Sequence, residues 1–313
     1  MHRFKVSTDS FEESYEITKE NAKTYLVPES NYKIETSNGP RYTAVCPSCK
    51  NPIRLFGITK EIIKTLANGE TTIIRPYGKH LEHSTSIAEY NKFAYETCPL
   101  SSHYRWTNID DKWDTPLPIN YEIYNALRKN FDTVLYILAH SIGIAGFSYA
   151  EAQQILKNYL DAQGYMWKGA TVDNLPWFLF YASGENFRVW NKIVLEGTPI
   201  HEYLKTRKDI KLTPEIRDSK LIGYRVTSEQ YLIDTIEFGV YNRHCDVDED
   251  LEEYVDIRIL QLKGNPPADI VCKNRIFVDL NAFPKIVKSP NRIRNNRLKE
   301  LGEQIMPKLE ESS

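Results

Sequence analysis

The sequence lacks the features that would place the chain in a membrane or export it. Its longest apolar runs, "TVLYILAH" and "PWFLFYA", fall well short of the roughly 18 residues that a membrane-spanning helix needs. The first residues, "MHRFKVSTDSFEESYEI", contain no apolar stretch of the kind found in a secretory signal. We therefore expect a cytoplasmic protein in which short apolar runs form the core.

An excess of charge of one sign is also missing. The 40 Lys and Arg residues and 42 Asp and Glu residues give a formal net charge of −2. Contact with nucleic acid or an anionic membrane would therefore need a local patch. The sequence has no P-loop, GxGxxG, GxSxG or HExxH motif. It thus lacks the common signatures of nucleotide-binding enzymes, serine hydrolases and zinc proteases.

Cysteine is scarce, and the five residues are unevenly distributed. Two of them form Cys46-Pro-Ser-Cys49, and a third, Cys98, is again followed by proline. His80 lies between Cys49 and Cys98 in the sequence. In a reducing cytosol, such a pair more often binds a metal or acts in catalysis than forms a structural disulfide. Thiolate and imidazole suit zinc, and a closed structural site needs four such ligands. The sequence therefore predicts structural Zn²⁺ bound by Cys46, Cys49, His80 and Cys98.

Other interpretations of these residues remain open. His83 and His103 are alternatives to His80, since Cys98 and His103 also have a workable spacing. A thioredoxin-like redox pair should open a helix after a buried strand, whereas Pro52 and the following "IRLFGI" favour a strand. Unlinked core cysteines are the third interpretation. Two further cysteines in strand-like sequence are expected to be ordinary thiols, buried or half-exposed: Cys245 and Cys272.

Residues 1–115 are expected to form a mixed, turn-rich head. The stretch "NYKIETSNGPRYTAVCP" indicates a hairpin that leads the chain to Cys46. "TKEIIKTLANG" predicts a short helix over residues 59–69, capped by Thr59, and "ETTIIRPYG" predicts a strand that enters a turn. The polar, proline-containing "NIDDKWDTPLPIN" then indicates a domain boundary.

The rest of the chain divides into a helical domain, residues 116–205, and a β-rich domain, residues 206–313. An apolar stripe from Ile123 to Leu138 indicates one helix, and "SYAEAQQILKNYLDAQG" and "NLPWFLFYASG" indicate two more. Four runs rich in β-branched and aromatic residues follow, and "RIRNNRLKELGEQIMPKL" predicts a closing helix. We therefore expect an α+β fold with a zinc-stapled head, a small helical middle domain and a β-rich C-terminal domain closed by a helix.

Basic residues gather near the end of the chain. Residues 273–299 contain eight Lys or Arg residues and one acidic residue, which predicts an exposed surface that binds DNA or RNA through phosphates. Its expected members are Lys288, Arg292, Arg294, Arg297 and Lys299. Alternatively, this segment is a solvated terminal helix, or it pairs with the acidic run "DVDEDLEEYVD", residues 246–256.

Two short resemblances bear on function. Residues 42–98, through Cys46-Pro47, Cys49 and His80, resemble the zinc-knuckle heads of bacterial competence-type and mobile-element proteins, which implies nucleic-acid contact. Abundant Tyr, Asn, Lys and Ile would also suit an AT-rich bacterial or mobile-element gene.

Asp234, Gln261 and Lys263 on predicted strands resemble the PD-(D/E)xK nuclease core, in which carboxylates hold Mg²⁺. Gln261 replaces the usual carboxylate and the Pro-Asp pair is absent, so polar alternation on an ordinary strand is the simpler interpretation. We therefore expect a non-enzymatic binding or regulatory protein with no catalytic residues. A nuclease and a protein-binding inhibitor or adaptor are the alternatives.

Overall fold

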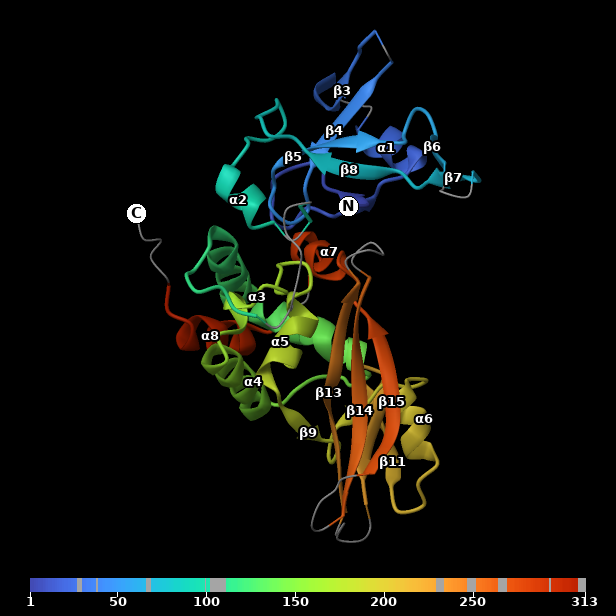
Figure 1. The fold of residues 1–313 in the computed structure, drawn as a ribbon. Coiled ribbons are helices and arrows are strands. Elements are labelled where there is room, and N and C mark those ends of the chain that lie inside the picture. Colours follow the sequence, from blue (N-terminus) through green and yellow to red (C-terminus); the bar gives the residue numbers. More distant parts are fainter. Residues whose placement is uncertain are drawn as a thin grey trace. The chain divides into compact units, whose positions relative to one another are not determined.

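The protein forms two compact units (Figure 1), and its α+β class is the predicted one. The computed structural model describes residues 1–26, 30–37, 39–65, 69–98, 100–101, 111–228, 234–246, 252–263, 269–292 and 294–308. One unit is built from Met1–Ile109, and the other from Asp110–Asp246 and Glu252–Ser313. The helices of the expected middle domain and the sheets that follow belong to the same unit, and their division into two domains at residue 205 stays a prediction. Within the described part of the chain, no helix combines the length and apolar character needed to cross a membrane.

The first unit is built on a four-stranded antiparallel sheet. Its strands, in spatial order, are β3 (Lys33–Ile34), β4 (Arg41–Val45), β5 (Pro52–Phe56) and β8 (Tyr77–His80). Three smaller pieces precede the sheet and one follows it: β1 (Arg3–Phe4) paired with β2 (Tyr15–Glu16), α1 (Lys19–Leu26), the 3₁₀ turn η1 (Ser30–Tyr32) and, after the sheet, α2 (Lys92–Glu96). The core joins Phe4, Ile17, Leu26 and Ile53 to two buried cysteines, Cys46 and Cys98. The predicted hairpin before Cys46 is confirmed as β3 and β4.

The predicted helix over residues 59–69 is wrong. In its place β6 (Ile62–Thr65) pairs with β7 (Thr71–Ile74), and Ile63 lies opposite Ile73. Successive β-branched residues lose rotamer freedom in a helix and fit a pleated strand. A helix of this length is also marginal in water without packing, and Ile63 is exposed. Cross-strand pairing with the second Ile-rich run therefore outweighs the helical pattern.

The three predicted helices of the second unit are confirmed. They are α3 (Pro118–Ile142), α4 (Tyr149–Asp161) and α5 (Leu175–Ser183), with a 3₁₀ turn η2 (Gly164–Met166) between the last two. Ser148 and Glu151 form the expected capping box at the start of α4. Within α3, Asn130 departs from helical geometry with φ −131° and ψ 25°, and the helix kinks at that point.

Two antiparallel sheets follow these helices. One has the order β15 (Asp269–Phe277), β14 (Glu252–Lys263), β13 (Asp234–Asp246) and β9 (Asn186–Arg188); the other has the order β10 (Ile193–Val194), β12 (Lys220–Thr227) and β11 (Lys211–Arg217). Between β10 and β11 lies α6 (Pro199–Lys205). On β14, buried Val255, Ile257 and Ile259 alternate with less buried residues. One face of the larger sheet therefore belongs to the core.

The chain closes with α7 (Ala282–Lys288) and the predicted terminal helix, α8 (Asn296–Ile305). Helix α8 lies along α3 (Figure 1). A Cβ at Gly302 would come within 2.8 Å of Phe131 Cβ, so the two helices approach closely only because this position has no side chain. Beyond the helix, Arg128 donates from Nε to the Met306 carbonyl at 2.8 Å. The C-terminal segment is thus part of the second unit's core.

Candidate metal centre

A tight turn between β4 and β5 carries the first two cysteines. The backbone N–H of Cys46 donates to the Asn51 carbonyl at 2.8 Å, and the N–H of Lys50 donates to the Cys46 carbonyl at 3.1 Å. Lys50 adopts a left-handed conformation with φ 60°, which is uncommon for a residue other than glycine. These bonds hold Cys46 and Cys49 in one compact loop at the end of the hairpin.

The other two residues of the cluster come from later segments of the same unit. His80 is the last residue of β8 and pairs with Ile53 of β5. Cys98 follows α2, and its N–H donates to the Tyr95 carbonyl at 3.1 Å. Asn91 caps the start of α2, and its side chain accepts a hydrogen bond from the N–H of Ala94. Three stretches that are distant in sequence therefore meet at one point.

The geometry of the four groups fits a tetrahedral metal site. The potential ligand atoms of Cys46, Cys49, His80 and Cys98 all lie within 4.8 Å of one another. The Sγ atoms of Cys46 and Cys98 are 3.8 Å apart, and Cys49 Sγ is 3.2 Å from His80 Nε2. Zinc–sulfur bonds of about 2.3 Å in a tetrahedron place two sulfurs about 3.8 Å apart, whereas a disulfide needs about 2.05 Å. The cluster can therefore hold a metal ion such as zinc.

Burial sets the electrostatics of these thiols. Cys46 is 0% exposed and Cys98 1% exposed, and burial raises the pKa of both thiols. Hydrogen bonds from the Cys46 and Cys98 thiols and from His80 lower the pKa of Cys49. If all three thiols lost their protons in so small a buried volume, the resulting thiolates would repel one another. A divalent cation would neutralise that repulsion, which suits a soft S₃N donor set.

Groups around the cluster are arranged to orient the sulfurs. Asn51, 1% exposed, donates from Nδ2 to Cys49 Sγ at 3.3 Å. The same amide group bonds to the backbone N–H and carbonyl of Asn91. The backbone N–H of Leu100 donates to Cys98 Sγ at 3.4 Å. Such outer contacts fix ligand orientation and tune ligand basicity in metal sites.

The structure thus brings together all four residues selected from the sequence. His83 is exposed and is not in the group, while His103 lies outside the described residues. The chain after Cys49 enters β5 rather than a helix, which disfavours the redox alternative. Cys245 and Cys272 lie on β13 and β15, and their side chains are outside the described part.

No family model matches the chain, and no match was found among curated proteins or solved structures. The geometry and chemistry of the chain's own residues therefore carry the functional conclusions.

The predicted phosphate-binding segment has a different environment from the one expected. Arg292 donates to Asn130 Oδ1 at 3.1 Å. Arg294 pairs with Asp132 Oδ2 at 2.8 Å and donates to the Lys129 carbonyl at 3.2 Å. The expectation that these two arginines are exposed is wrong, because the kink in α3 supplies acceptors for both, and a buried carboxylate needs a counter-charge.

The remaining basic residues of that segment are more open. Lys288 and Arg297 are exposed, with the Arg297 guanidinium 4.4 Å from the centre of the Tyr149 ring. Lys299 is half-buried and lies 3.5 Å from Glu303. In the acidic run, the Asp256 carboxylate binds Arg275 and buried Glu253 accepts from Asn174. Because Arg275 lies within residues 273–299, the Asp256 contact is a pairing of the predicted kind, whereas Glu253 contacts Asn174 instead.

The residues that resemble a nuclease core lie on neighbouring strands. Asp234 on β13 is opposite Lys263 on β14, and Gln261 is opposite Ile236. Their side chains lie outside the described part of the chain. Nuclease activity therefore stays a prediction.

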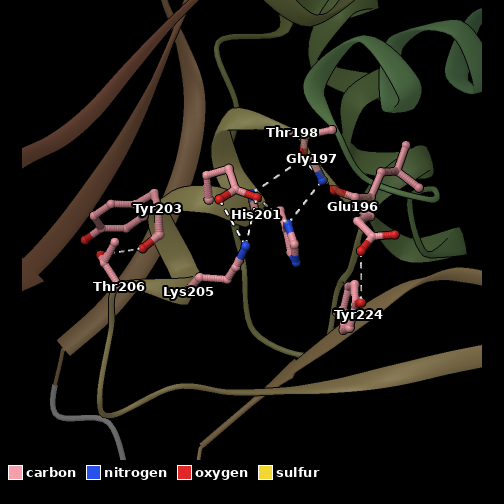
Figure 2. A network of polar contacts seen from close by, with 10 residues as sticks. Glu196, Gly197, Thr198, His201, Tyr203, Lys205, Thr206 and Tyr224 are labelled. Carbon is pink, nitrogen blue, oxygen red and sulfur yellow. Dashed lines mark hydrogen bonds and ion pairs between the residues drawn. The ribbon is translucent and has the colours of Figure 1, made fainter.

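A polar cluster around His201 was not identified from the sequence (Figure 2). The N–H of Gly197 donates to His201 Nδ1 at 3.2 Å, and Glu202 Oε1 lies 3.1 Å from the same nitrogen. The imidazole stacks on Tyr224 with ring centres 4.8 Å apart, and Tyr224 donates to Glu196 at 3.2 Å. These contacts join α6 to β12, and they account for the buried histidine as a structural residue.

Proposed function

We propose that Cys46, Cys49, His80 and Cys98 bind a structural zinc ion and that the chain is a non-enzymatic binding protein. The observation that carries the metal proposal is the convergence of four soft donor atoms within 4.8 Å of one another. Three thiolates and one imidazole match the composition of closed structural zinc sites.

A structural role follows from the number of donors. Catalytic zinc sites have three protein ligands and keep a fourth position for water or substrate, whereas four protein ligands complete the tetrahedron. In this chain the three cysteines and His80 would occupy all four positions and leave none for water or substrate. The ion would therefore serve the fold rather than a reaction.

The ion would hold the first unit together by linking its strands to α2. Cys46 and Cys49 belong to the hairpin, His80 to β8, and Cys98 to the segment after α2. The unit spans only about 100 residues and its sheet strands are short. Small cores of this kind often need a metal or another cross-link for stability. Metal binding would then contribute directly to folding.

The binding partner is the second part of the proposal. A solvated basic arm built from all five predicted residues is disfavoured by the contacts of Arg292 and Arg294 with α3. Lys288 and Arg297 are exposed and remain candidates for contact with DNA or RNA. The proposed origin in a bacterial mobile element rests on composition and on the zinc-knuckle resemblance.

Elemental analysis of purified protein tests the metal centre. We expect about one zinc per chain, the stoichiometry of a single closed site. The His80→Ala variant should lose most of that zinc, and the matched His83→Ala variant should retain it, because His83 is exposed and outside the cluster. Cobalt in place of zinc should give the intense visible bands of a tetrahedral thiolate site.

Two outcomes would contradict the proposal. One is full zinc occupancy in a Cys46→Ser, Cys98→Ser double variant. The other is a chelator that removes the ion without changing hydrogen exchange of the β4 and β5 backbone amides. A structural ion must protect the strands that carry its ligands, because its binding energy is folding energy.

A further inference from the structure

The outer face of β14 and β15 presents aromatic and basic side chains in register. Three cross-strand pairs lie on it: Tyr254 with Phe277, Asp256 with Arg275, and Arg258 with Lys273. The residues between them on β14 are buried, so the alternation separates a core face from this outer face. We call this set of six residues the β14–β15 face.

The aromatic part of the β14–β15 face is accessible. Phe277 is 64% exposed, and its ring packs edge-on against Tyr254 with centres 6.1 Å apart. The Arg275 guanidinium lies 3.7 Å from the centre of the Tyr254 ring, and the Arg275 side chain is 49% exposed. The Phe277 ring and the stacked Arg275 guanidinium are therefore neighbours on the same face of β15, two residues apart in sequence.

The orientation of Arg275 is fixed before any partner arrives. Its Nε and Nη2 donate to the two Asp256 carboxylate oxygens at 2.9 and 3.2 Å. This fork, together with the Tyr254 ring below it, holds the guanidinium in one place. Because its side chain stays half-exposed, the guanidinium can offer its outer surface to another flat group at little cost in rotamer entropy.

Charge on the face favours an anionic partner. Arg258, Lys273 and Arg275 carry positive charge and Asp256 carries one negative charge, a local excess in a chain whose net charge is −2. Flat π surfaces next to basic groups match the two parts of a nucleotide strand, because bases stack on aromatic rings and guanidinium planes while phosphates meet Lys and Arg.

We infer that the β14–β15 face binds single-stranded nucleic acid. A base stacks on Phe277, the neighbouring base stacks on the Arg275–Tyr254 pair, and the backbone phosphates run past Lys273 and Arg258. Duplex bases are already stacked on one another, so the face selects unpaired strands. The inference rests on the proposed binding role of the chain and is independent of the zinc ion.

The test measures fluorescence anisotropy of a labelled, mixed-sequence DNA strand of about 20 nucleotides, which spans a typical single-strand site. Wild-type protein should bind the strand more tightly than the same sequence as a duplex. Phe277→Leu should weaken binding about tenfold, whereas Phe277→Tyr should retain it, because only the tyrosine keeps a π surface. Lys273→Gln should lower the salt slope by about 0.7, the contribution of one phosphate.

Matched variants make the result specific. Ile216→Ala removes an equally exposed apolar side chain on β11 and should leave affinity unchanged. Equal urea midpoints for wild type, Phe277→Leu and Phe277→Tyr would show that the fold is intact. Equal affinity of the Leu and Tyr variants, equal or tighter duplex binding, or no binding at low salt would each overturn the inference. Affinity that depends on Lys288 and Arg297 but not on Phe277 would do so as well.

Zinc content measured on the same samples separates the two proposals. Strand binding by protein that carries no zinc contradicts the metal centre and supports the β14–β15 face. Full zinc occupancy without strand binding contradicts the β14–β15 face alone.

Discussion

The contact between Asp132 and Arg294 should fasten the C-terminal segment to α3, and a double-mutant cycle measures how strongly. The Asp132 side chain is 1% exposed and that of Arg294 is 28% exposed, with Arg294 Nε 2.8 Å from Asp132 Oδ2. The same carboxylate oxygen accepts the N–H of Asn295, the residue that caps α8, at 3.1 Å. One buried carboxylate thus holds both an arginine and the start of the last helix.

The expected magnitude follows from these contacts. Breaking a fully buried ion pair costs about 3–5 kcal/mol. Because Arg294 is partly exposed, the contribution of the Asp132–Arg294 pair should be smaller, about 1–2 kcal/mol. Loss of the Asn295 hydrogen bond adds about 1 kcal/mol. We therefore expect Asp132→Ala to lower the free energy of unfolding by about 2–3 kcal/mol. The coupling with Arg294→Ala should be about 1–2 kcal/mol.

Urea unfolding followed by tryptophan fluorescence is the assay, since four of the five tryptophans belong to the second unit: Trp113, Trp167, Trp177 and Trp190. Lys299→Ala is the matched control, because Lys299 pairs with Glu303 at 3.5 Å on the same segment and the two side chains are 40% and 38% exposed. Such pairs contribute about 0–1 kcal/mol. Zero coupling in the cycle, or an Asp132→Ala cost no larger than that of Lys299→Ala, would refute the reasoning and restore a freely solvated basic arm.

Three further predictions concern other contacts. Gly302→Ala should destabilise the second unit by about 1–2 kcal/mol because its Cβ would meet Phe131 at 2.8 Å, whereas Gly146→Ala, with open space around its Cβ, should stay within about 0.5 kcal/mol of wild type in the same urea assay. Burial alone would raise the pKa of Glu151, but Lys192 and Ser148 outweigh it and hold the pKa below its ordinary value. The stability from this contact should therefore be present above about pH 4.5 and be lost as pH falls through the folded-state pKa. The difference in free energy of unfolding between wild type and Glu151→Gln should then become smaller in acid, as measured by urea unfolding at several pH values. Asn51→Ala removes the amide that donates to Cys49 Sγ and should weaken zinc affinity about tenfold in a chelator competition, and unchanged affinity would show that the amide does not support the site.

Local chemistry made the helices of the second unit and the cysteine turn predictable. The capping box of Ser148 and Glu151 and the apolar stripe of α3 depend on residues three or four apart. The pair Cys46 and Cys49 likewise signals its chemistry through spacing alone. The prediction of a helix over residues 59–69 was wrong because Ile62 and Ile63 pair with a second strand, β7. The local sequence pattern contains no information about that partner.

By itself, then, the sequence determined the α+β class, the helices of the second unit and the cysteine and histidine residues from which a metal site could be made. Only the tertiary structure decided that His80 rather than His83 joins the three cysteines, because strand pairing between β5 and β8 places it there. It also decided that Arg292 and Arg294 dock on the kink of α3, and that Phe277, Arg275 and Tyr254 share one open face. Each of these depends on the register or packing of segments far apart in the chain, which is set by the burial of the whole core rather than by neighbouring residues.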